Sequence, residues 1–236
     1  MFERLHHQRI ALLLASLDAR LLMQAHCLFG GGTAMALRFG EYRESVDVDF
    51  LVSDEEGYRR LRQLLRGGRG IASIVRDGAP APEALQETRA DQYGIRTRVG
   101  VGGVGIKFEI VREGRIVLDE PAEEDAVCGV ATLSRVDMVA CKLLANSDRG
   151  MDDSTFNRDL IDLAMMSPER GVLAVALAKA EGAYGKDVRE DFTRALERLA
   201  AVEGRLERCM QAMAMTLPKA VVWQRLRTLE QRFDRL

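Results

Sequence analysis

The sequence lacks the features that mark several specialised classes of protein. Its four cysteines have no metal-ligand spacing, which favours buried free thiols in a reducing cytoplasm over a zinc site or a disulfide framework. No hydrophobic run is long enough to span a membrane, and the apolar stretch within residues 1–22 is expected to be an amphipathic helix, not a signal peptide. The net charge of -2 gives no global signature of nucleic-acid binding. What remains is a globular, cytoplasmic protein of 236 residues, long enough to bury a sizeable core.

Patterning predicts a mixed α/β first part and a helical second part. Residues 54–66 carry apolar positions at helical spacing, and short strand-like runs follow at 71–75, 95–99 and 104–111. The glycine-rich run 99–105 is followed by a strand and not by a helix, so a hairpin or a bulge is expected there and a dinucleotide fingerprint is not. The expected architecture is a mixed sheet with helices on one side (1–130), followed by an α-helical bundle (131–236).

The segment from Phe29 to Phe50 carries the strongest chemical signal. Strand alternation places Val46, Val48 and Phe50 toward a core and sets Asp47 and Asp49 together on the opposite face. Two close carboxylates repel, and a divalent cation such as Mg²⁺, which prefers oxygen ligands and carries substrate phosphates, would relieve this repulsion. Upstream, a glycine turn leads into a helix whose free backbone N–H groups can hold a phosphate.

This combination resembles the nucleotidyltransferase superfamily that includes DNA polymerase beta, and within it the AbiEii/AbiGii toxins of type IV toxin–antitoxin systems. The resemblance rests on a GGTA turn followed by an Arg-x-Ser-x-Asp-x-Asp-Phe strand, here Gly31, Gly32, Thr33, Ala34, Arg43, Ser45, Asp47, Asp49 and Phe50. It implies an Mg²⁺-dependent (or Mn²⁺-dependent) enzyme in which Asp47 and Asp49 hold the metal. It also implies that Gly31, Gly32, Thr33 and Ser45 hold the phosphates of a nucleoside triphosphate.

The resemblance also implies a third metal carboxylate on a neighbouring strand. Glu109 stands at that place, on the less apolar face of the strand-like run 104–111. Family members often carry aspartate here. Glutamates on strands frequently face solvent, and that alternative stays open.

In the second half, the resemblance points to a lysine and an Arg-Asp-x-x-Asp-Leu motif that complete the nucleotide site. Here these are Lys142, then Arg158, Asp159, Asp162 and Leu163. Asp159 is the candidate catalytic base, and Asp162 could instead orient a neighbouring cation. The alternative for Lys142 is that its ammonium snorkels to water, and its replacement by alanine is expected to cost little stability. Asp159 and Asp162 should share one helix face.

For the toxin branch, the resemblance implies transfer of a nucleoside monophosphate to RNA, with transfer RNA as acceptor, and a cognate antitoxin as partner. A small-molecule or protein acceptor uses the same site, and a non-catalytic nucleotide-binding module is the alternative from another class. Intact Asp47, Asp49 and Lys142 argue against that module. The basic stretch from Lys219 to Arg235 is a candidate RNA contact.

Overall fold

The computed structural model describes residues 2–236 and divides the chain into two compact units. Unit 1 comprises Met1–Glu41 and Ser45–Ser134, and unit 2 comprises Tyr42–Glu44 and Arg135–Leu236. The expected boundary after residue 130 therefore falls after Ser134 in the structure. The assignment of Tyr42–Glu44 to unit 2 has no counterpart in the sequence pattern.

Unit 1 is built on a mixed sheet with the strand order β1-β2-β6-β5-β3, in which β4 also pairs with β5. The strand β1 (Cys27–Gly30) is antiparallel to β2 (Val48–Val52), which is parallel to β6 (Val104–Arg112). The hairpin of β5 (Gly94–Val101) and β6 turns at Gly102 and Gly103, both with positive φ, and confirms the expected hairpin. The short strands are β3 (Glu83–Ala84) and β4 (Arg89–Ala90), and β7 (Ala126–Val127) pairs separately with β8 (Val130–Ala131).

Three phenylalanines on adjacent strands form the centre of the sheet's core. The rings of Phe29, Phe50 and Phe108 are fully buried and lie 5.5 and 5.6 Å apart between successive centroids. Because side chains alternate along a strand, the neighbouring Asp49 and Glu109 face away from this core. The expectation for Val46 was wrong: it precedes β2, where no ladder fixes alternation, and its side chain is exposed.

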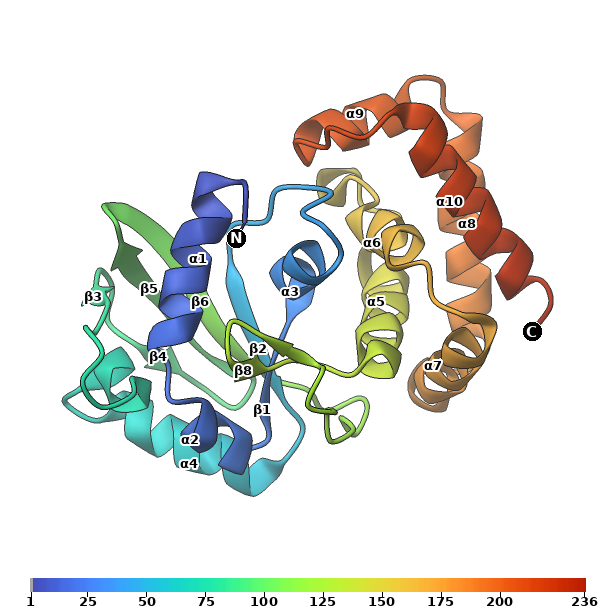
Figure 1. Ribbon diagram of the computed structural model, residues 1–236. Helices are drawn as coiled ribbons and strands as arrows, with labels where there is room; N and C mark the ends of the chain where they lie inside the picture. Colours follow the sequence, from blue (N-terminus) through green and yellow to red (C-terminus); the bar gives the residue numbers. More distant parts are fainter. Residues whose placement is uncertain (1) are drawn as a thin grey trace. The chain divides into compact units, whose positions relative to one another are not determined.

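The helices of unit 1 are α1 (Leu5–Ser16), α2 (Ala19–Gln24), α3 (Gly31–Arg38) and α4 (Glu55–Arg66). Figure 1 shows α1 and α3 lying against the sheet, where α1 contacts β5 and α3 contacts β2. The strand expected at 71–75 is a 3-10 helix instead, Gly70–Ile74, because Ile71 and Ile74 point to the core at helical spacing. The mixed α/β class is as expected.

From Arg135 to Leu236, unit 2 consists of helices and the turns that connect them (Figure 1). Its first helix, α5 (Arg135–Arg149), packs against α6, α7 and α8 and so forms the centre of the bundle. The other helices are α6 (Arg158–Met166), α7 (Arg170–Tyr184), α8 (Asp187–Ala201), α9 (Arg205–Ala212) and α10 (Lys219–Phe233), with a short 3-10 helix at Asp153–Thr155. Within residues 2–236, no helix is both long and apolar enough to cross a membrane.

Candidate functional site

The glycine turn and the second aspartate are in direct contact. Gly30 ends β1 opposite Asp49 in the antiparallel register, and Gly31 begins α3 with φ +66°. A Cβ atom built on Gly31 would lie 2.4 Å from the Asp49 carboxylate oxygen Oδ2. Glycine is therefore required at this position for two reasons, the left-handed backbone and the close approach of a carboxylate. The turn places the N-terminus of α3 beside Asp49, as the sequence pattern predicts.

Thr33, which is expected to contact phosphate, forms hydrogen bonds within unit 1. Its side chain is buried, and its hydroxyl donates to the carbonyl oxygen of Asp47 and lies 2.8 Å from the Ser45 hydroxyl. Thr33 thus fixes the backbone of the segment that carries Asp47. Ser45 is only half-buried and remains a candidate for a phosphate contact.

A histidine that the sequence motifs do not indicate supports the same segment. His7 is fully buried, and its Nε2 accepts a hydrogen bond from the backbone N–H of Ser45 at 3.1 Å. Its Nδ1 lies 2.7 Å from Glu41 Oε1, so the network assigns the proton to Nδ1. Burial lowers the pKa of His7 below its ordinary value, although Glu41 acts in the opposite direction. A neutral His7 therefore fits its two partners.

The three carboxylates expected to hold metal are not equally arranged. Asp49 and Glu109 are direct neighbours in the parallel register of β2 and β6, and Asp47 and Asp49 are both half-buried. The Glu109 carboxylate, however, is bound by Lys107 and by Arg96, whose Nε lies 3.1 Å away. Within residues 2–236, no three His, Cys, Asp or Glu side chains are grouped as a metal site. The all-oxygen pair of Asp47 and Asp49 suits a hard cation, whereas Glu109 is engaged as an ion-pair partner.

Lys107 is a second group that sequence reasoning missed. Burial disfavours its charged form, but Glu109 and then Asp47 and Asp49 outweigh this and raise the pKa of its ammonium. Lys107 therefore supplies positive charge close to the aspartates. The only sequence signal was its place two residues before Glu109 on the same strand.

Unit 2 contains a buried cluster of opposite charges centred on Asp162. Arg43 binds this carboxylate with two hydrogen bonds, at 2.7 Å from Nε and 3.0 Å from Nη2, and the Tyr42 hydroxyl donates to it at 2.6 Å. Lys142 Nζ lies 2.5 Å from Asp162 and 2.8 Å from Asp159. The expected shared face of Asp159 and Asp162 is thus confirmed by a common partner. The lysine does not snorkel, since its side chain is only 6% exposed.

Arg149 completes this cluster from the last turn of α5. Its Nε and Nη2 donate to the two oxygens of Asp159 at 2.7 and 2.9 Å, while its side chain stays 39% exposed. Three cations (Arg43, Lys142 and Arg149) therefore face two carboxylates, and one positive charge is left over. In the sequence, Arg149 stands in a polar stretch, where an arginine is usually solvated, so no motif singles it out.

The surroundings of Asp159 argue against its expected role as a general base. Burial alone would raise its pKa, but Lys142 and Arg149 outweigh burial and hold the pKa well below its ordinary value. A carboxylate with a low pKa and both oxygens occupied is a weak proton acceptor. The contacts instead make Asp159 the group that positions Lys142 and Arg149.

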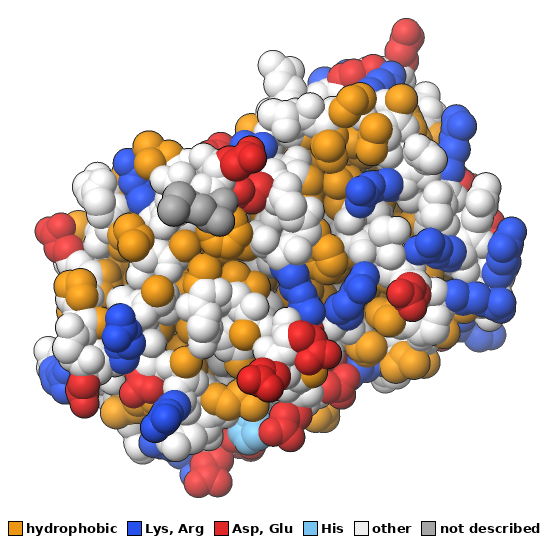
Figure 2. Space-filling model, in the orientation of Figure 1, with side chains coloured by type: hydrophobic (Ala, Val, Ile, Leu, Met, Phe, Trp, Pro, Cys, Tyr) orange, Lys and Arg blue, Asp and Glu red, His pale blue; other side chains and the backbone are white. Residues whose placement is uncertain are grey.

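The arginines of α10 are largely used within unit 2. Arg225 donates to the carbonyl oxygen of Met165, and Arg232 donates to those of Ser167 and Pro168. These carbonyls lie at the C-terminal end of α6, where cations are favoured by the helix dipole. Figure 2 shows basic side chains gathered at the right edge of the view, where Figure 1 draws α8 and α10. Two of the arginines expected to contact RNA thus stabilise the bundle.

A strand-turn-helix with a glycine beside an aspartate of the next strand, on a mixed sheet followed by helices, defines a protein of the nucleotidyltransferase class. Residues 12–235 match the family model described as "Nucleotidyl transferase AbiEii toxin, Type IV TA system". The chain therefore belongs to the AbiEii family of nucleotidyl transferase toxins.

Solved structures show the same fold at low sequence identity. JHP933 from Helicobacter pylori superposes with a TM-score of 0.57 at 16% identity, covering 100% of this chain and 95% of that chain. A second H. pylori structure, described as a candidate nucleotidyltransferase, gives a TM-score of 0.57 at 15% identity, with coverage of 100% and 97%. No curated protein matches the sequence.

Proposed function

We propose that this protein is a metal-dependent nucleotidyltransferase that moves a nucleoside monophosphate from a nucleoside triphosphate to an acceptor hydroxyl of RNA, acting in the cytoplasm as the toxin of a toxin–antitoxin or phage-defence system. The observation that carries the proposal is the contact between Gly31 and Asp49. It brings the backbone N–H groups at the start of α3 next to a carboxylate, an arrangement in which a phosphate and a cation would be bound side by side.

Asp47 and Asp49 are the residues that would hold Mg²⁺ or Mn²⁺. Their oxygens are hard ligands and both side chains are half-buried, and Asp49 lies on the face of β2 opposite the phenylalanine core. A bound cation would neutralise phosphate charge and lower the pKa of an attacking hydroxyl. Glu109 could bind the cation only after its carboxylate leaves Lys107 and Arg96. We therefore assign Glu109 a weaker contribution to metal binding than the two aspartates.

The remaining groups either bind the phosphates of the substrate or hold the phosphate-binding groups in position. Gly31, Gly32 and Ser45 offer backbone and hydroxyl donors to phosphate oxygens, while Thr33 and His7 hold the backbone that presents Ser45 and Asp47. In unit 2, the surplus positive charge of the Arg43, Lys142 and Arg149 cluster favours a triphosphate. Asp159 and Asp162 keep the ammonium of Lys142 and the guanidinium of Arg149 in fixed positions.

RNA as the acceptor, with transfer RNA as the first candidate, rests on the family, which is one of toxins. Membership of a type IV toxin–antitoxin family also supports a cognate antitoxin as partner. The base of the nucleotide is left to experiment.

The test is to incubate the protein with Mg²⁺, each labelled nucleoside triphosphate and total cellular RNA. We expect label in a band of transfer-RNA size and release of pyrophosphate, with both lost in Asp49→Asn. Label in a small molecule or a protein would support nucleotidyl transfer but overturn the proposal that RNA is the acceptor. Nucleotide-dependent thermal stabilisation without any pyrophosphate release would overturn the enzyme in favour of a binding module.

A further inference from the structure

The strongest local excess of positive charge in the chain lies on α4 and the turn after it. From Gly57 to Arg76 the chain carries six arginines and no acidic residue, although the whole protein has a net charge of -2. The acidic residues of α4, Glu55 and Glu56, are confined to its first turn. The global charge balance conceals this basic segment.

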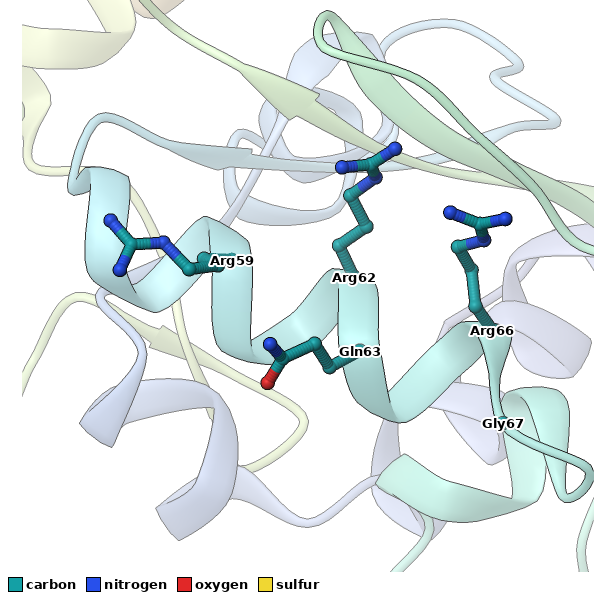
Figure 3. Close-up of a pocket in the computed structure, with 5 residues that line it drawn as sticks. All are labelled: Arg59, Arg62, Gln63, Arg66 and Gly67. Carbon is teal, nitrogen blue, oxygen red and sulfur yellow. The ribbon is translucent and has the colours of Figure 1, made fainter.

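Three of these arginines form one stripe along the helix. Arg59, Arg62 and Arg66 are spaced by three and four residues, which places successive side chains about 5 to 6 Å apart at Cβ on one face. With Gln63 and Gly67 they line a hollow of about 420 Å³. Figure 3 shows Arg62 and Arg66 leaving the helix in the same direction, with Arg59 nearer its start. We call this surface the α4 arginine stripe.

The stripe has no internal partner that explains it. Within the described residues, none of its three guanidinium groups forms an ion pair, in contrast to Arg225 and Arg232 of α10, which bind backbone carbonyls. The Nε of Arg62 is shielded from solvent and has no hydrogen-bond partner. An unpaired buried donor is energetically costly unless a ligand or water satisfies it.

The residues that line the hollow at the α4 arginine stripe are suited to bind an extended anion. Its lining contains no apolar side chain, whereas sites that enclose small molecules are mostly apolar. Guanidinium groups pair with phosphates through two parallel hydrogen bonds, and a row of them matches a row of phosphates. The glycines after the helix, Gly67 and Gly68, are both exposed and leave room for a backbone to approach.

We infer that the α4 arginine stripe binds the phosphate backbone of the acceptor RNA. The inference rests on the proposed function for the identity of the polyanion. In this inference the stripe, and not α10, is the main RNA contact of the chain. The stripe arginines form no ion pair within the described residues, whereas Arg225 and Arg232 of α10 bind backbone carbonyls.

The experiment measures binding of a transfer-RNA-sized RNA to the full chain as a function of salt, without nucleotide. It compares the wild type with the triple variant Arg59→Gln, Arg62→Gln and Arg66→Gln. A control triple variant, Lys186→Gln, Arg194→Gln and Arg208→Gln, removes the same charge from exposed positions of unit 2 outside α10.

We expect the stripe variant to bind at least tenfold more weakly at low salt. The magnitude of the slope of log K against log salt should fall by about 2 to 3, since three phosphate contacts are lost at about 0.7 to 0.9 each. The control should keep the wild-type slope. Equal losses in both triple variants, an unchanged slope in the stripe variant, or no RNA binding by the wild type would each overturn the inference.

A second measurement separates this inference from the proposed function. Thermal stabilisation by Mg²⁺ and a nucleoside triphosphate should be the same in the stripe variant and the wild type, because α4 holds none of the nucleotide-site residues. If RNA binding follows the stripe but no nucleotide is transferred to any acceptor, the proposed function fails and the binding surface stands.

Discussion

Gly31 and Asp49 are packed so closely that no side chain fits between them. The Cβ atom that any other residue would carry at position 31 would come within 2.4 Å of Asp49 Oδ2. The glycine turn and the Asp-x-Asp strand, which are separate motifs in the sequence, are therefore one structural unit. A change in either is expected to disturb the other.

Gly31→Ala is expected to lower nucleotide transfer by more than tenfold. Alanine at φ +66° costs about 1 to 2 kcal/mol, and its methyl group also displaces the Asp49 carboxylate. Gly40→Ala is the matched control, because Gly40 has φ +83° but nothing within 4 Å of its added Cβ. Gly31→Ala should lose at least as much stability in thermal unfolding as Gly40→Ala, and only Gly31→Ala should lose activity. Full activity in Gly31→Ala would show that the close contact has no functional role.

Asp47→Asn and Asp49→Asn are each expected to abolish transfer while the protein stays folded. Each removes a charged ligand but keeps the size of the side chain. Without metal, thermal stability should be unchanged or higher, because one of two close carboxylates is neutralised. Glu109→Gln should lose less activity than either. Transfer within a few-fold of wild type in the aspartate variants, with matched circular dichroism, would refute the metal assignment.

Lys142→Met is expected to destabilise unit 2 by about 3 to 5 kcal/mol, because it leaves Asp159 and Asp162 buried with fewer partners. The structure thus reverses the expectation of a small cost. Arg149→Gln, at a side chain that is 39% exposed, should cost less. Urea unfolding measures both. The double variant Lys142→Met with Asp159→Asn should recover part of the loss, and failure to recover any would argue against the ion pair as the cause.

Stability should also depend on pH through His7. Its pKa in the folded protein lies below the ordinary value of 6.5, so the unfolded chain binds the proton first as the pH falls. The free energy of unfolding should therefore decrease as the pH drops from 6.5 toward the lowered pKa. Below that pKa, the contribution of His7 should no longer change with pH. This decrease should disappear in His7→Gln. The control variant His26→Asn, at an exposed position, should show the same decrease as the wild type. The same decrease in His7→Gln would assign the effect to another group.

The sequence predicts the parts of the fold that depend on residues close together in the chain. The helix from Glu55 to Arg66, the β5–β6 hairpin and the turn at Gly31 all follow from local periodicity or glycine content. The run 71–75 forms most of a 3-10 helix and not a strand, and its few apolar residues do not distinguish strand from helical spacing. Short apolar runs are ambiguous without their packing partners.

The parts of the site that could not be predicted depend on long-range pairs. Asp162 meets Arg43, which lies 119 positions earlier, and Ser45 meets His7, 38 positions earlier. Nothing in the local pattern at His7 or Arg149 indicates these partners. The family motif placed Lys142, Asp159 and Asp162 in one group, but only their burial shows that the acids hold the cations in place.

The short segment Tyr42–Glu44 limits how this protein can be cut. It belongs with the helical unit although the residues on both sides of it, Glu41 and Ser45, belong with the sheet. A fragment covering 135–236 would lack both the hydroxyl of Tyr42 and the guanidinium of Arg43, and so would bury the Asp162 carboxylate with Lys142 as its remaining cation. The helical unit is therefore incomplete as a continuous fragment of the chain, and a split version of the protein would have to supply Tyr42–Glu44 to it as a separate peptide.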